Sequence, residues 1–169
     1  MSLSMHEASV TAFIKSLSNL KACLEKAKAH AAEHKIEDAV LIGSRLYPDM
    51  LPLSAQVQIA TDIARSATAR LAGAEPGKYD DNEKTFDDLT ARIQRAVDDM
   101  AKLDKSAFEG ATARSITRPV RGEPHTFTGT NYLLQFAVPN VYFHVATAYD
   151  ILRHNGVPLG KADFLGAMD

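Results

Sequence analysis

The sequence contains almost no cysteine. Its 169 residues include one, Cys23, which cannot form an internal disulfide. Structural disulfides are typical of oxidising compartments, so a reducing compartment is the simplest expectation. For Cys23 itself, the role of a small core side chain is favoured over that of a catalytic thiol. A chain of this length buries most of the surface that it exposes when unfolded, so we expect residues 1–169 to form one domain.

The chain also lacks an excess of basic residues and a recognisable export signal. Nineteen Lys and Arg stand against 21 Asp and Glu, which gives a net charge of −2, and the basic residues are scattered. A nucleic-acid-binding face needs a basic patch or stripe, so nucleic acid is not an expected partner. The first 20 residues have no basic start followed by an apolar run, so we predict a cytoplasmic protein.

Charge is absent from one long segment. No Asp, Glu, Lys or Arg lies between Glu123 and Asp150, although such residues make up 24% of the chain. The segment is long enough to be considered as a membrane span. It is interrupted by polar residues and one proline: Gln135, Pro139, Asn140, His144 and Thr147. We therefore predict no membrane association and interpret the segment as a helix buried on nearly every side.

Apolar residues recur at helical spacing in three earlier segments. They predict helices at about 4–34, 52–72 and 85–103, the first with a Ser4 and Glu7 capping box. Residues 115–120 and 125–128 alternate as two short strands do, with RGEP as the turn. The sequence therefore predicts an all-α fold, a four-helix bundle with a small β-hairpin before the last long helix.

The connections between these elements carry further predictions. Asp49 stands where it could cap the second helix, and Thr128 or Thr130 could cap the last one. The run KYDDNEK, residues 78–84, is interpreted as a solvated loop. The segment after Gly156 is expected to fold back over the bundle.

Polar side chains occur where the last helix should be buried. Asn140 and His144 are four residues apart and share a helical face, and Gln56 falls beside the apolar stripe of the second helix. Buried polar groups need partners, so these three could form a hydrogen-bonded network that fixes the bundle. Pro139 removes a backbone hydrogen bond and predicts a kink or local opening just ahead of Asn140.

The order of elements resembles the DinB-like superfamily of bacterial four-helix bundles. Three motifs, PDMLPL, VPNVYFH and AYDILRHNGVPLGK, resemble a bacterial family known only as domain of unknown function number nineteen ninety-three. The superfamily resemblance implies a divalent metal held by one His on the second helix and two His four apart on the last. Here Gln56 is the polar residue nearest the first place, and His144 is flanked four residues away by Asn140 and Ala148. A tight zinc site is not expected, because carboxamide oxygens are weaker zinc ligands than imidazole, but a weakly bound divalent metal on His144 stays open.

Three functions follow from this reading. The first is binding of a small ligand in a degenerate metal-site pocket. Its candidate residues are His144, Asn140 and Gln56, with Asp49, Tyr47 and Tyr142 around the mouth. The second is a metal-dependent enzyme with His144 as metal ligand, and no cofactor beyond that metal is predicted. The third is a structural homodimer, because the last helix has more apolar positions than its neighbours need, including Leu134, Val138, Val141 and Val145.

Overall fold

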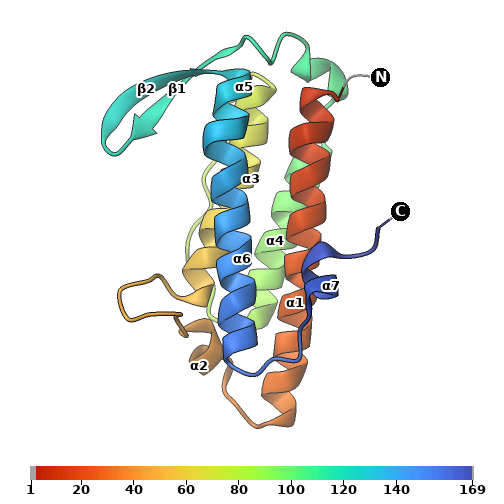
Figure 1. The fold of residues 1–169 in the computed structure, drawn as a ribbon, viewed down its shortest axis with the longest axis vertical. Coiled ribbons are helices and arrows are strands. Elements are labelled where there is room, and N and C mark those ends of the chain that lie inside the picture. Colours follow the sequence, from red (N-terminus) through yellow and green to blue (C-terminus); the bar gives the residue numbers. More distant parts are fainter. Residues whose placement is uncertain (1–2, 169) are drawn as a thin grey trace.

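Four long helices form the body of the molecule (Figure 1). The computed structural model describes residues 3–168. The helices are α1 (Ala12–Glu33), α3 (Leu53–Leu71), α4 (Phe86–Ala101) and α6 (Val138–His154). Helix α3 packs against α4 and α6, and α1 packs against the same two, so α4 lies diagonally opposite α6. The predicted four-helix bundle is confirmed.

Reciprocal capping bonds close two helix starts, the first of them as predicted. Ser4 and Glu7 form reciprocal hydrogen bonds between side chain and backbone, with Glu7 N–H donating to Ser4 Oγ at 3.1 Å. A short π-helical segment, η1 (Glu7–Thr11), then leads into α1. Thr85 and Asp88 make the equivalent pair at the start of α4. These bonds satisfy backbone donors that a helix start otherwise leaves free.

The connector before α3 holds the short helix α2 (Asp38–Ile42) and an exposed turn. The prediction that Asp49 caps α3 is wrong, since Pro52 occupies the N-cap position and no side chain caps it. The backbone provides the partner instead, because Leu53 N–H donates to the carbonyl of Ser44 at 3.0 Å. Asp49 is left exposed on the turn.

Strands β1 (Ser115–Val120) and β2 (Glu123–Thr128) pair antiparallel beside one end of the bundle (Figure 1). The turn between them is shorter than predicted, since it consists of Arg121 and Gly122 alone. Both have positive φ angles, 52° and 91°, as a two-residue hairpin turn requires. A 3-10 segment, η2 (Lys105–Phe108), precedes the hairpin.

The last helix opens where Pro139 predicted it would. It begins as α5 (Gly129–Asn131), capped by Thr128, continues as the π-helical segment η3 (Tyr132–Ala137) and then becomes α6. In the wider turn, Val138 N–H reaches the carbonyl of Leu133, five residues earlier. The Asn140 amide donates to the Phe136 carbonyl at 2.6 Å, so it satisfies one backbone acceptor near the opening.

The tail after α6 folds back on α1, as predicted. It carries α7 (Lys161–Leu165), and the Lys26 ammonium lies 2.5 Å from an Asp163 carboxylate oxygen. Cys23 is buried in the core, and burial raises the pKa of its thiol to about 11. A thiol with that pKa stays protonated at neutral pH, as the core interpretation of Cys23 requires. No helix within residues 3–168 has both the length and the apolar character to cross a membrane.

Candidate functional site

Gln56 on α3 and His144 on α6 meet across the interface of the two helices. Gln56 is 2% exposed. Its amide nitrogen donates to the carbonyl of Leu51 at 3.1 Å, and its oxygen lies 2.7 Å from His144 Nδ1. The prediction that Gln56 faces the interior and lies near His144 is confirmed.

This contact determines the chemical state of the imidazole. Because the Gln56 nitrogen is used by Leu51, the oxygen is the group that faces His144, and Nδ1 must carry the hydrogen. Burial lowers the pKa of His144, so the ring is neutral at pH 7. Its Nε2 is then an unprotonated acceptor, and it makes no hydrogen bond to any residue from 3 to 168.

The other predicted residues do not join this pair. Asn140 is half-buried but uses its amide on its own helix, at the Phe136 carbonyl. Tyr47 and Asp49 are exposed on the connector before α3. Tyr142 lines a separate hollow against α1 and the tail, together with Phe164. The structure therefore brings together two of the six predicted residues.

The residues around His144 do not fit the three-ligand metal site that the DinB-like resemblance implies. Within the described chain, no three or more His, Cys, Asp or Glu side chains are grouped so that they could hold a metal ion. The Gln56 oxygen is engaged by His144 Nδ1, and the Asn140 nitrogen donates to the Phe136 carbonyl of its own helix. A metal at this place would have the Nε2 of one histidine as its imidazole ligand, which is the arrangement of a weak site.

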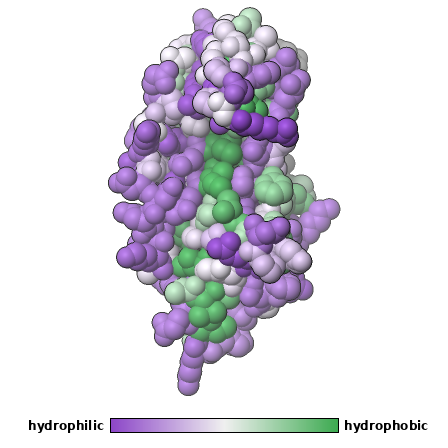
Figure 2. All heavy atoms as spheres, turned by 90° about the vertical axis from the view of Figure 1, so that its left-hand side faces the viewer, coloured by the Kyte–Doolittle hydropathy of each residue, from purple (hydrophilic) through white to green (hydrophobic). Residues whose placement is uncertain are grey.

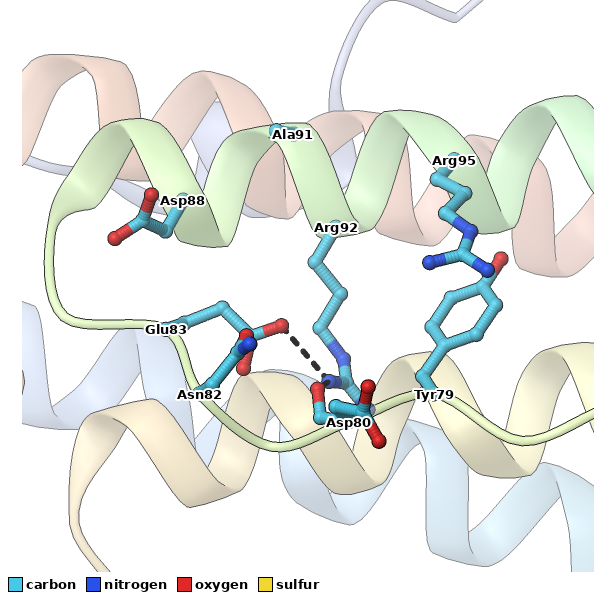
Figure 3. A pocket seen from close by; sticks show the side chains of 8 residues that line it. All are labelled: Tyr79, Asp80, Asn82, Glu83, Asp88, Ala91, Arg92 and Arg95. Atoms are coloured by element: carbon cyan, nitrogen blue, oxygen red, sulfur yellow. Dashed lines mark hydrogen bonds and ion pairs between the residues drawn. The ribbon is translucent and has the colours of Figure 1, made fainter.

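A second polar cluster, which the sequence analysis did not find, surrounds Arg92 of α4 (Figure 3). Its side chain is 2% exposed and lies 2.9 Å from Asp62, 3.0 Å from Asp81 and 2.9 Å from Glu83. Its Nε also donates to the Thr61 hydroxyl at 2.9 Å. Burial alone would raise the pKa of Glu83, but hydrogen bonds from Arg92 and Gln58 outweigh it and hold that pKa below its usual value.

The loop that supplies Asp81 and Glu83 was wrongly interpreted as fully solvated. Tyr79 in the same loop lies against three guanidinium groups, with its ring centre 4.2 Å from the guanidinium carbon of Arg65, 3.9 Å from that of Arg95 and 5.3 Å from that of Arg92. Its hydroxyl donates to Asp99 at 2.6 Å. Burial and that hydrogen bond raise the pKa of Tyr79 to about 12, so the hydroxyl remains a donor at neutral pH.

One sequence feature could have indicated this cluster. Arg92 follows Leu89 by three residues and precedes Ala96 by four, so it lies on the buried stripe of α4. A charge in such a position requires partners of opposite sign, and the acidic residues at 80–83 in the loop before α4 are one possible source of them. Figure 3 shows Arg92 and Arg95 reaching from α4 toward the loop across a pocket of about 410 Å³.

The fold and the His144 position define this chain as a four-helix bundle of the DinB type, with a π-helical opening in its last helix. The sequence matches the model of a domain of unknown function, DUF1993, over residues 5–165. The chain belongs to that family.

A solved structure supports the same assignment. The chain is similar to a DinB family member protein from Shewanella denitrificans, with 41% sequence identity and a TM-score of 0.92. The match covers 97% of this chain and 93% of that one. No curated protein matches the chain.

Proposed function

We propose that the protein binds a small organic ligand at His144, in the position that resembles the metal site of DinB-like bundles. The observation that carries this proposal is the hydrogen bond from His144 Nδ1 to the Gln56 oxygen. It fixes the ring and leaves Nε2 as an oriented acceptor, which a ligand hydroxyl or N–H can use. A buried partner that only stabilised the bundle would not need to leave the second nitrogen free.

Apolar groups beside His144 indicate the rest of the ligand. Phe143 lies edge-on to the imidazole at 5.1 Å and is 56% exposed. Leu51, whose carbonyl holds Gln56, is 47% exposed. An exposed phenyl ring beside the acceptor, with a second exposed apolar side chain on the residue that holds Gln56, suits a molecule with an apolar body and a single donor, such as a phenol or an alcohol.

The test compares binding of phenol and simple alcohols to the wild type and to His144→Phe, which keeps an aromatic ring but removes both nitrogens. Ligand-observed NMR should show binding to the wild type and at least about a tenfold weaker signal for the variant, the usual effect of losing one hydrogen bond in a binding site. His154→Phe, at the exposed end of the same helix, is the matched control. Equal binding by all three proteins would exclude His144 as the site.

A divalent-metal-dependent enzyme is the alternative that the superfamily resemblance suggests. It depends on a metal held through His144 Nε2. Metal content after purification, together with the effect of added zinc or nickel on the melting temperature, measures this directly. Substoichiometric metal and an unchanged melting temperature would remove the enzyme alternative.

A homodimer is the second candidate, and one observation favours it. The exposed positions of the last helix from residue 131 to residue 143 are all uncharged. They are Asn131, Leu134, Gln135, Pro139, Tyr142 and Phe143. Figure 2 shows a narrow hydrophobic strip along the face that carries the hairpin, flanked by hydrophilic side chains. Two of the four apolar residues that suggested the dimer, Val141 and Val145, are instead fully packed inside the bundle.

A further inference from the structure

A further hollow, separate from the His144 position, lies between α3 and the loop that follows it. Its volume is about 330 Å³. Helix α3 contributes Asp62, Arg65, Ser66 and Arg70, and the loop contributes Pro76, Gly77, Lys78 and Tyr79. Arg65 and Ser66 follow Asp62 by three and four residues and Arg70 follows Ser66 by four, so the four residues lie toward one side of the helix.

The charges that line this hollow are unbalanced. Two arginines and one lysine face a single carboxylate, Asp62. That carboxylate is already used, because its Oδ1 lies 2.9 Å from Arg92 and 3.8 Å from Arg65. Arg70 and Lys78 make no ion pair and no side-chain hydrogen bond with any other residue between 3 and 168.

Arg65 is held in place for binding. Its Nη2 donates to the Gly77 carbonyl at 2.8 Å, and the Tyr79 ring lies against its guanidinium at 4.2 Å. The residue is 8% exposed, and its Nε is a buried donor with no hydrogen-bond partner among the described residues. A guanidinium fixed by its neighbours loses little conformational entropy when it binds an anion.

We propose that this hollow binds a small oxyanion with two negative charges, of the phosphate or dicarboxylate class. Arg65 and Arg70 offer guanidinium donors, Lys78 adds a third positive charge from the loop, and the Ser66 hydroxyl lies on the same wall. A bound dianion would balance Arg70 and Lys78, which no carboxylate among residues 3–168 pairs with.

The experiment titrates inorganic phosphate and succinate into the protein by calorimetry, with sodium chloride at the same ionic strength as the reference. Arg70→Gln with Lys78→Gln removes two charges from the hollow. Arg153→Gln with Lys161→Gln removes the same two types of charge from exposed positions outside it. Saturable binding of either anion to the wild type, weakened by about tenfold or more in the first double variant alone, supports the proposal.

Two results would overturn it. One is heat from phosphate and succinate that does not exceed that of chloride, which indicates screening of surface charge rather than a site. The other is an equal loss of affinity in both double variants. Circular dichroism melting of each variant separates loss of binding from loss of folding, and binding by His144→Phe distinguishes this hollow from the His144 position.

Discussion

Arg92 places a positive charge between α3 and α4 with almost none of its side chain exposed. Replacing it with leucine leaves Glu83, whose side chain is 9% exposed, without its main partner. Removing one member of a buried ion pair typically costs about 3 kcal/mol or more, so Arg92→Leu should lower the free energy of unfolding by about that amount. Urea unfolding measures it, and Arg95→Leu, at an exposed position one turn further on, should cost about 1 kcal/mol or less.

Protonation of His144 should make stability depend on pH. Burial lowers its pKa in the folded state, so the unfolded chain binds more protons below the ordinary histidine pKa of about 6.5. The contribution of His144 to the free energy of unfolding is therefore fully present above that pH. It is lost as the pH falls through the lower pKa of the folded state. His144→Gln should flatten the fall in melting temperature between about pH 7 and pH 5, while His154→Gln keeps the wild-type slope. Identical slopes in all three proteins would contradict the lowered pKa of His144 in the folded protein.

Among individual side chains, the sequence predicted the contact between Gln56 and His144 but not the Arg92 cluster. The pair follows from helical spacing, because both residues lie close to apolar stripes of helices that had to face each other. Asn140 shared the spacing of His144, yet the π-helical opening offered it the nearer Phe136 carbonyl. The Arg92 cluster depends on where an irregular loop folds, and spacing along a helix does not determine that.

Thr85 shows how a local motif fixes the start of an element. Its hydroxyl accepts from Asp88 N–H at 3.1 Å, and Asp88 accepts from Thr85 N–H at 2.9 Å. Thr85→Ala should lower the free energy of unfolding by about 1 kcal/mol, the typical value of an N-cap. Thr90→Ala, in the middle of α4, makes the same chemical change without removing a cap and should have a smaller effect. Chemical unfolding of the two variants provides the comparison, and equal losses would show that the cap contributes nothing specific.

Features of the helices and strands were predictable from the sequence where the chemistry of one residue fixes the local backbone hydrogen bonding. Pro139 predicted the opening because it cannot donate the backbone hydrogen bond that an α-helix needs. The sequence could not show that the chain would widen into six π-helical residues rather than kink. Asp49 illustrates the opposite case, since a residue suited to capping lies on an exposed turn while Pro52 takes the N-cap position and the Ser44 carbonyl binds Leu53 N–H.

The bundle as a whole follows from the amphipathic stripes and from the uncharged segment between Glu123 and Asp150. That segment was expected to be buried on nearly every side, and its inner face is, but Leu134 and Phe143 are 61% and 56% exposed. Four helices have one shared core, so an apolar last helix retains an outer face that the other three cannot cover. The spacing of apolar residues in the sequence identifies this extra apolar face, but it does not identify a partner for it.

A second copy of the chain is the partner we expect for this face. An uncharged surface can lie against its own copy across a two-fold axis without repulsion between like charges. Leu134→Glu places a charge in that surface and should convert a dimer into a monomer, as sedimentation equilibrium would show from the mass at several concentrations. Ala91→Glu, on α4 diagonally opposite α6, adds the same charge and should leave the dimer intact. A wild-type mass that stays monomeric at every concentration would contradict the dimer and leave Leu134 exposed to solvent.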